Sequence, residues 1–281
     1  MNERPRLTHL SWFAWLRVGV AILAQLMAGS ARADETITVA ATGSVVPMLE
    51  ILADDFATQR SDLKIQVLRP PAGSSGAIKG VASGRVDIGV AARALKPGEA
   101  TAKLEAVPWV STAFVIAANH AGAPKGLTLA ELAAIWSGAT QRWPDGAPIR
   151  LLLRPPDDAD IAALRAMSPE MNRAVDIALL RPGIPRAEHD LRNLEMLRSA
   201  PGAIGGSTLG LLLSSRSRLS MLAIDGVTPD VRSLQDGSYP YNRTLFLVSD
   251  RDTRASAFIA YLQSARARTL LERNGYIAAK R

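Results

Sequence analysis

Apolar and polar positions alternate with two different periods along the chain. Residues 36–41 (TITVAA) are apolar and β-branched, a pattern typical of a short buried strand. After Thr42-Gly43-Ser44, apolar side chains recur at helical spacing over 45–60, which predicts a helix. The same order returns in a strand at 63–68, a Gly/Ser turn at 73–76, a helix at 77–83 and a strand at 86–91.

The rest of the chain continues this alternation, which predicts an α/β fold built on a doubly wound parallel sheet. In such sheets, ligands bind beyond the carboxyl ends of the strands, where the Gly/Ser turns lie. Thr128 is the expected N-cap of a helix, because Glu131 follows three residues later as in a capping box. The further predicted elements are an extended segment at 107–119, helices at 128–135, 160–167 and 169–180, strands at 149–153 and 244–248, a Gly-rich turn at 201–206, and a helical region at 253–273 that ends at Gly275.

Residues 1–33 have the features of a secretory signal peptide. Three arginines precede or begin an apolar stretch from Val18 to Ala28, and residues 31–33 (ARA) form a small-x-small cleavage pattern. We therefore expect cleavage before Asp34 and a periplasmic mature chain. The alternative is an uncleaved membrane anchor, but the apolar stretch is shorter than the roughly 20 residues that a spanning helix needs.

The composition is that of a globular protein. With 281 residues, 48% of them hydrophobic, the chain is long enough to bury two cores. Residues 1–33 contain four Arg and one Glu, so removing their +3 from the formal net charge of +7 leaves +4. This balance favours anionic ligands in a general way. The basic residues are scattered with few aromatic residues between them, so no nucleic-acid partner is predicted.

Catalytic chemistry finds little support in the residue types present. The chain has no cysteine, which excludes disulfides, thiolate catalysis and Cys-based metal sites. Beyond residue 33 the only histidines are His120 and His189, and neither belongs to a recognisable motif. A Walker loop, HExxH and a G-x-S-x-G elbow are all missing from the sequence. The sequence therefore predicts no enzyme, no cofactor and no metal site, and a hydrolase is the last-ranked alternative.

Two Gly/Ser segments at predicted strand-to-helix junctions are candidates for anion binding. Gly43 and Ser44 belong to the first, and Ser74, Ser75 and Gly76 belong to the second. The first turn of a helix offers unpaired backbone N–H groups and the positive end of the helix dipole, and glycine lets a ligand approach the backbone. The alternative is that the serines only cap their helices. Both turns face one edge of the sheet, which strengthens the anion-site interpretation. The anion-binding and the capping interpretations both stay open at this point.

Charged residues near strand ends provide further candidates. Arg154 follows a predicted strand and can offer a bidentate fork to an oxyanion, and Arg93 is a weaker candidate of the same kind. Asp157, Asp158 and Asp160 could bind a hard cation such as calcium. The EF-hand spacing is missing, so we favour capping of the following helix by these carboxylates.

The candidate turns belong to longer segments that resemble the phosphate-binding protein family of Pst-type ABC transporters. Within residues 73–95, GSSGAIK resembles the G-S-S-G-x-[IV]-K block of that family, and VDIG resembles its V-D-[IF]-G strand. The resemblance covers nearly all of the mature chain, and five segments in the family's order make it specific. The other four are 126–143 (GLTLAELAAIWSGATQRW), 200–206 (APGAIGG), 237–247 (GSYPYNRTLFL) and 263–277 (QSARARTLLERNGYI).

This resemblance implies a Venus-flytrap periplasmic binding protein with two α/β lobes, formed by 34–114 with 244–281 and by 115–243. It implies that phosphate or a similar oxyanion is held between the lobes by direct hydrogen bonds, without a metal. The expected partner is an ABC permease in the inner membrane, and the expected oligomeric state is a monomer. Carried over position by position, the ligand-binding residues are Gly43, Ser44, Ser74, Ser75, Gly76 and Arg154, with Asp158 in the turn that follows the arginine.

Two positions depart from the family's pattern. Asp158-Ala159-Asp160 stands where the family often has a Ser-Gly-Thr turn, and Ala92 stands where typical members have Asp or Ser. A carboxylate about 4 Å from a phosphate charge near a protein surface is repelled by up to roughly 4 kcal/mol. Either the aspartates point away, or they are protonated, or the ligand is not phosphate. The alternative function is a degenerate binding-fold protein with a changed or lost anion site, acting as a sensor or an envelope accessory protein.

Overall fold

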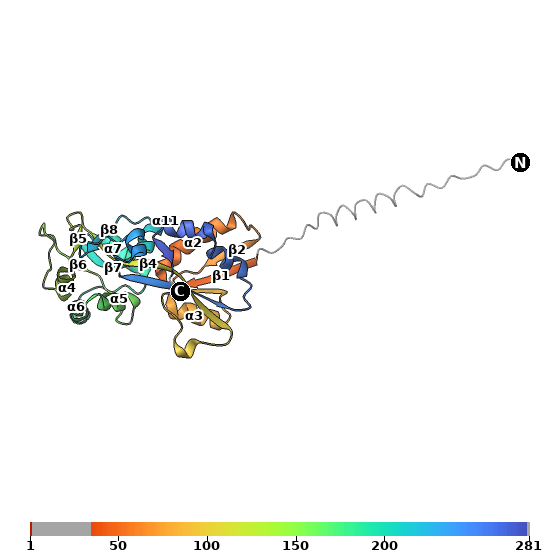
Figure 1. Ribbon diagram of the computed structural model, residues 1–281, viewed down its shortest axis with the longest axis horizontal. Coiled ribbons are helices and arrows are strands. Elements are labelled where there is room, and N and C mark those ends of the chain that lie inside the picture. The colour runs from red at the N-terminus through yellow and green to blue at the C-terminus, as the bar shows by residue number, and fades with distance from the viewer. Residues whose placement is uncertain (2–34, 280–281) are drawn as a thin grey trace. The chain divides into compact units, whose positions relative to one another are not determined.

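The computed structural model describes Met1 and residues 35–279, so the predicted signal peptide lies outside the described residues except for Met1. The chain divides into two units, Met1–Glu35 and Thr36–Arg281. Apart from Glu35, which begins the first strand, the described helices and strands belong to the second unit (Figure 1). Within the described part of the chain, no helix combines the length and the apolar character that crossing a membrane requires.

The N-terminal strands and helices follow the predicted order. Apolar residues at helical spacing between positions 46 and 57 form the buried face of the first long helix, as the periodicity predicts. The first and third strands pair in parallel, with Val39 opposite Ile88. The elements are β1 (Glu35–Ala41), α2 (Val46–Ala57), β2 (Leu63–Val67), α3 (Gly73–Ala82) and β3 (Ile88–Ala91).

The main sheet is mixed, whereas the sequence pattern predicted a parallel one. Its strand order is β2-β1-β3-β9-β4-β7-β6. Strand β9 (Asn242–Asp250) lies between β3 and β4 (Leu104–Asn119) and runs antiparallel to both. Apolar runs identify buried strands but carry no information about strand direction, so the antiparallel insertion of β9 could not be predicted from them.

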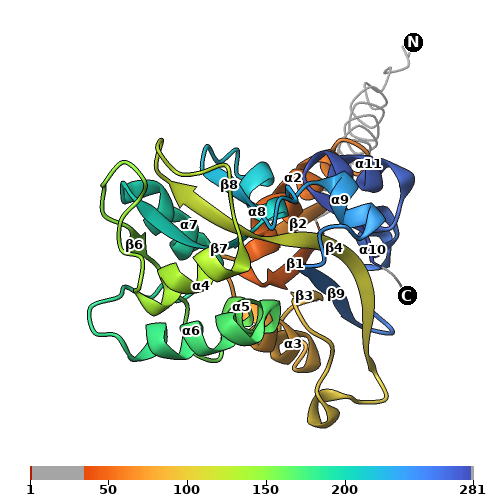
Figure 2. The ribbon, with the colours of Figure 1, turned by 60° about the vertical axis from the view of Figure 1, so that its left-hand side comes forward.

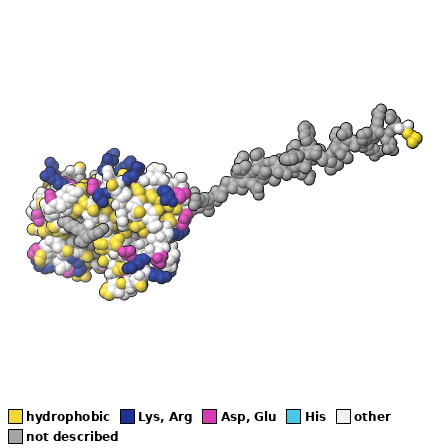
Figure 3. Space-filling model, turned by 45° about the vertical axis from the view of Figure 1, so that its right-hand side comes forward, with side chains coloured by type: hydrophobic (Ala, Val, Ile, Leu, Met, Phe, Trp, Pro, Cys, Tyr) yellow, Lys and Arg dark blue, Asp and Glu magenta, His cyan; other side chains and the backbone are white. Residues whose placement is uncertain are grey.

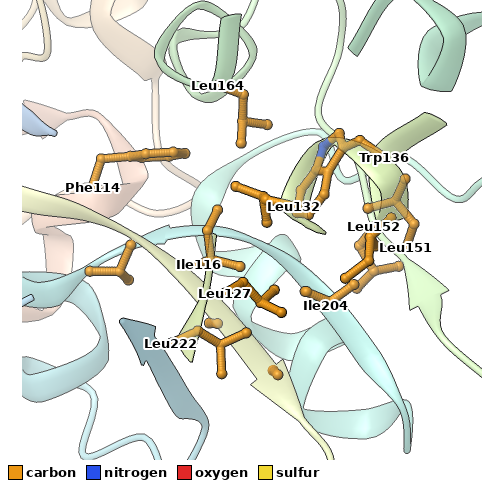
Figure 4. Close-up of a cluster of buried hydrophobic side chains, with 14 of the residues drawn as sticks. Phe114, Ile116, Leu127, Leu132, Trp136, Leu151, Leu152, Leu164, Ile204 and Leu222 are labelled. Carbon is orange, nitrogen blue, oxygen red and sulfur yellow. The ribbon is translucent and has the colours of Figure 1, made fainter. Parts of the chain in front are cut away.

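The long strand β4 runs through both halves of the fold. Its residues 104–113 pair with β9, and its residues 114–119 pair with β7 (Ala203–Thr208). One hydrophobic core surrounds β1, α2 and the nearer half of β4. Another surrounds the farther half, where Phe114 and Ile116 belong to the same hydrophobic cluster as Trp136 and Ile204 (Figure 4). Strand β4 therefore connects two separately packed regions.

Helices and short strands complete the second region. Thr128 caps α4, and Glu131 completes the predicted capping box. Helix α6 packs against α4 and α5 on one side of the sheet (Figure 2). The elements are β5 (Gly126–Leu127), α4 (Leu129–Ser137), β6 (Arg150–Leu151), α5 (Ala159–Met167), α6 (Pro169–Leu180), α7 (Asp190–Ser199), α8 (Leu209–Ser214), β8 (Ser220–Ile224) and α9 (Val231–Asp236).

Two segments predicted as turns lie in regular elements. Residues 73–76 form the first turn of α3. Most of the Gly-rich segment 201–206 belongs to β7, where the missing side chains allow close packing. A Cβ atom at Gly206 would lie 2.7 Å from Cζ of Phe114. Glycine marks both turns and close approaches, and the turn interpretation was wrong for these two segments.

The C-terminal region contains two helices where one helical region was predicted. They are α10 (Ser256–Leu262) and α11 (Ala265–Arg273). Ser264 separates them because its hydroxyl caps α11 by accepting from the amide of Ala267. Gly275, with φ of 82°, lies between the end of α11 and β10 (Tyr276–Ala278), which pairs with β4.

Charged side chains of both signs are spread over the surface. In Figure 3, Lys/Arg and Asp/Glu side chains lie intermixed on the face shown. Exposed ion pairs of the described residues include Arg60 with Asp62 and Arg69 with Glu50. The scattered distribution of basic residues predicted from the sequence is found on this face.

Candidate functional site

A cleft of about 950 Å³ brings together segments that are far apart in the sequence. Thr42 and Gly43 reach it from the end of β1, and the start of α3 reaches it from the same N-terminal region. The segment after β3, the segment before α5, the start of α7 and the start of β9 contribute the charged residues. Polar and charged side chains from several elements thus converge on one space, an arrangement typical of small-molecule sites.

The structure brings most of the predicted ligand residues together. Of the seven, the lining residues are Gly43, Ser74, Ser75, Arg154 and Asp158.

Two predicted ligand residues do not line this cleft. Ser44 is 1% exposed, and its hydroxyl has no hydrogen-bond partner among the described residues. Its carbonyl oxygen accepts from the Tyr276 hydroxyl at 3.1 Å. Gly76 lies inside α3, close to the side chain of Ala72.

The start of α3 presents hydroxyl groups to the cleft. No side-chain hydrogen bond from the described residues caps this helix. The Ser74 hydroxyl accepts from the amide of Ala92 at 2.9 Å, and the Ser75 hydroxyl accepts from Arg93 at 2.9 Å. A hydroxyl that accepts a hydrogen bond still has its own proton to donate. The two serines can therefore hold the loop after β3 and donate to a bound ligand.

Arg93 lies at the same edge of the cleft but is held by an acidic partner. Its guanidinium donates two hydrogen bonds to Glu99, at 2.6 and 2.8 Å. These bonds are the main reason why the pKa of Glu99 falls to about 2. Glu99 therefore holds the Arg93 side chain in place at the edge of the cleft.

Arg154 is buried, and protein groups engage most of its donors. Its Nη1 donates to the carbonyl of Ala187 at 2.6 Å, and its Nη2 donates to Oδ2 of Asp158 at 2.6 Å. Its Nε lies 3.8 Å from Oδ2 of Asp160. The predicted ligand arginine is thus already neutralised by two carboxylates of the following turn.

Asp158 caps α5, as the helix-capping interpretation of the acidic segment predicted. Its Oδ1 accepts from the amide of Asp160 at 2.9 Å. Burial, followed by the negative charge of Asp160, raises the pKa of Asp158, and the charge of Arg154 opposes this effect.

Arg243, at the start of β9, was not predicted as a site residue. It is buried, forms an ion pair with Asp160, and lies 3.6 Å from Oδ1 of Asp190. Its guanidinium carbon lies 5.6 Å from the centroid of the Phe114 ring. Arginine is rarely buried without a partner, so its place in an apolar strand segment was a usable signal for a site residue.

Asp190 was also missed, because the helix that it begins was not predicted. It accepts from the Thr42 hydroxyl at 3.4 Å. A Cβ at Gly43 would lie 2.9 Å from Oδ2 of Asp190, so this glycine permits the close approach of α7. Gly43 thus has a packing role beside the predicted ligand role.

The charges around the two arginines do not cancel. Among the described residues, the carboxylates of Asp158, Asp160 and Asp190 face the two guanidinium groups of Arg154 and Arg243. With all groups ionised, this cluster carries one excess negative charge. Binding of a fully ionised anion next to it therefore requires displacement or protonation of a carboxylate.

His189 lines the cleft next to Asp190, but its ring has a structural contact. Its Nδ1 accepts from the amide of Arg192 at 3.1 Å and so caps α7. Across the residues that the structure describes, no group of three or more His, Cys, Asp or Glu side chains is arranged to hold a metal ion. The geometry described here serves the binding of a small polar solute through hydrogen bonds and charge.

Comparison with known proteins gives a consistent picture. The phosphate-binding protein PstS of Bacillus subtilis is 26% identical over 247 residues, which cover 84% of this chain and 78% of PstS. A Clostridium perfringens protein assigned to the phosphate ABC transporter substrate-binding proteins, solved with bound phosphate, aligns with a TM-score of 0.71 at 23% identity. The alignment covers 88% of this chain and 100% of that one.

An ABC-type phosphate transport receptor from Vibrio cholerae aligns with a TM-score of 0.60 at 20% identity, over 87% of this chain and 100% of the receptor. These structural likenesses confirm the predicted α/β fold class of a two-lobed periplasmic binding protein. Residues 27–266 match the family model PBP_like_2, a PBP superfamily domain. The chain belongs to the PBP superfamily.

Proposed function

We propose that this protein is a periplasmic solute-binding protein that captures phosphate or a similar oxyanion for an ABC importer. The observation that carries the proposal is the buried Arg154 in a cleft that also receives the start of α3 with Ser74 and Ser75. A guanidinium, a helix N-terminus and hydroxyl donors together suit a tetrahedral oxyanion. The likeness to Bacillus subtilis PstS supports the same ligand class.

In this proposal the ligand binds between two lobes, 34–114 with 244–281 and 115–243. The first lobe contributes Ser74 and Ser75, and the second contributes Arg154. Closing the lobes brings both sets of donors onto one anion, and the closed form docks on an inner-membrane permease. Strands β4 and β9 cross between the lobes and serve as the hinge.

The remaining parts of the proposal concern processing and chemistry. Residues 1–33 act as a cleaved signal peptide, which delivers the mature chain to the periplasm. The protein works as a monomer, binds no nucleic acid, needs no cofactor and catalyses no reaction. It delivers the solute, chemically unchanged, to the permease.

Calorimetric titration of the purified mature protein with phosphate near neutral pH tests this function. The protein is unfolded and refolded first, so that any carried-over ligand is removed. Dissociation constants of micromolar or lower are expected, and Arg154→Ala is expected to weaken binding at least about a hundredfold, because charged hydrogen bonds of about 1.5–3 kcal/mol each are lost.

Two further variants make this titration specific. Arg154→Lys keeps a cation for the neighbouring carboxylates but loses the planar fork, so it is expected to remain folded and to bind weakly. Arg60→Ala removes an exposed arginine paired with Asp62 and is the matched control, with unchanged affinity expected. Unchanged affinity in Arg154→Ala would show that the arginine is not a ligand residue.

One observation favours the second candidate function, a binding-fold protein with a changed or lost anion site. Asp158 and Asp160 already neutralise the only arginine that the family resemblance assigns to the ligand. A sensor or envelope accessory protein needs no high-affinity phosphate site. The absence of both binding heat and a thermal shift with phosphate would support this second function.

A further inference from the structure

The carboxylate of Asp158 accepts hydrogen bonds from the kinds of donor that bind an oxyanion. Its Oδ1 accepts from the amide of Asp160 in the first turn of α5, at 2.9 Å. Its Oδ2 accepts from Nη2 of Arg154, at 2.6 Å. A helix N-terminus and a guanidinium are the donors with which proteins commonly bind oxyanions. The Asp158 carboxylate is therefore an internal substitute for a bound anion.

The other N–H donors of Arg154 are hardly available to a ligand. Nη1 is bonded to the carbonyl of Ala187, and Nε is buried and faces Asp160. The Arg154 and Asp160 side chains are 5% and 1% exposed, whereas the Asp158 side chain is 20% exposed and lines the cleft. Asp158 is thus the partner of Arg154 that an incoming ligand can reach and displace.

We propose that Asp158 determines which ligands the cleft accepts, because its carboxylate competes with an incoming oxyanion for Arg154 and the N-terminus of α5. This inference rests on the proposed function. When an anion takes the place of Asp158 on Arg154, the carboxylate of Asp158 stays close by. Among the described residues, three carboxylates and the ligand then surround two guanidinium groups. Proton uptake by Asp158 removes one of these negative charges, so binding of the anion is coupled to binding of a proton.

The direction of the pH dependence follows from this coupling. Burial and the charge of Asp160 raise the pKa of Asp158, so it takes up a proton at a higher pH than an exposed aspartate does. As the pH falls, Asp158 releases Arg154 and the affinity for the anion rises. The other charged or titratable groups of the cleft and the buried cluster are Arg93, Lys96, Arg154, Asp157, Asp160, Glu188, His189, Asp190 and Arg243.

The test compares phosphate titrations of the mature protein, Asp158→Ser and Asp158→Asn from about pH 5 to about pH 8. Ser and Asn are both good N-cap residues, so α5 keeps its cap in each variant. The ionisation of phosphate itself cancels when dissociation constants are compared at one pH. Both variants are expected to bind at least about tenfold more tightly than the parent near pH 8, and the difference is expected to shrink as the pH falls.

A proton count provides an independent measurement. Calorimetry in two buffers with different ionisation enthalpies gives the number of protons taken up on binding. The parent is expected to take up more protons than either variant near neutral pH. His189→Asn is the control for the imidazole that also lines the cleft. Loss of the pH dependence in His189→Asn, with its retention in Asp158→Asn, would overturn the proposal.

The outcomes separate this inference from the proposed function. If the parent binds phosphate and both Asp158 variants show the same affinity at every pH, the role of Asp158 is wrong while the proposed function stands. If neither the parent nor the variants bind phosphate at any pH, the proposed function falls, and the inference falls with it.

Discussion

A side chain at Gly43 would collide with the start of α7, so Gly43→Ala is expected to destabilise the fold. The added Cβ would lie 2.9 Å from Oδ2 and 3.1 Å from Cβ of Asp190. Asp190 would have to move away from Arg243 and Thr42, its partners in the cleft. The expected loss in the free energy of unfolding is about 1–3 kcal/mol, measured by urea denaturation.

Gly98→Ala is the matched control for this substitution. A Cβ at Gly98 would have no heavy atom within 4 Å, and the backbone there is not in the left-handed region. The control is expected to leave stability unchanged or slightly raised. Equal losses at Gly43 and Gly98 would contradict the packing role of Gly43.

Single residues of the site could be predicted where they stand next to a recognisable element. Arg154 and Asp158 lie at the end of a predicted strand and the start of a predicted helix, and both line the cleft. Arg243 and Asp190 also line it, but their contact joins positions 243 and 190, and no local pattern carries that pairing. The sequence also gave no sign that Asp158 is paired with Arg154, because that depends on side-chain orientation.

The capping box of α4 provides a prediction at the scale of one element. The Thr128 hydroxyl accepts from the amide of Glu131 at 3.2 Å, and the Glu131 carboxylate accepts from the amide of Thr128 at 2.8 Å. Thr128→Ala is expected to lower the free energy of unfolding by about 1 kcal/mol, measured by urea denaturation. Thr140→Ala, at an exposed threonine just beyond α4, is the control and should change stability little. A loss of equal size at Thr140 would show that the cap is not the cause.

Helix boundaries were predictable where a residue has one clear local role, as Thr128 and Gly275 have. Helix α7 was missed although Leu191, Leu194 and Leu197 recur every three residues. The polar residues Asp190 and Asn193 share its buried face, which weakens this short apolar period. The direction of β9 was unpredictable for a different reason, since strand direction depends on how distant segments connect.

Asp87 provides a prediction at the scale of the whole molecule, because it joins three segments of the sheet region. Its carboxylate accepts from the amide and hydroxyl of Thr38 in β1, at 2.7 and 2.8 Å, and from Arg254 beyond β9 at 2.7 Å. Burial alone would raise the pKa of Asp87, but the hydrogen bonds from Arg254 and Thr38 outweigh it, so the pKa is lowered.

A lowered carboxyl pKa stabilises the fold at neutral pH, and this stabilisation is lost as the pH falls below the unfolded value of about 4. Asp87→Asn is therefore expected to be less stable than the parent near neutral pH, with the difference shrinking in acid. Denaturation curves at several pH values measure this difference. Asp252→Asn, at an exposed turn after β9, is the control and is expected to have the stability of the parent near neutral pH. A difference that stays constant with pH would contradict the role of the Asp87 charge.

The two-lobed organisation was predicted from the family resemblance rather than from the periodicity. The apolar pattern gave alternating strands and helices, which fits one sheet as well as two lobes. What separates the packed regions is the length of β4, whose two halves pair with β9 and with β7. The sequence of one extended apolar segment does not show that its two halves pair with different strands.

The place of β9 in the sheet limits the order in which the protein can fold during synthesis. This strand lies between β3 and β4, yet it is synthesised after residue 241. Until β9 has been synthesised, β3 and the first half of β4 therefore lack the strand that lies between them. The sheet can be completed only after nearly the whole chain has been synthesised, so its central strand pairings all wait for the C-terminal part of the sequence.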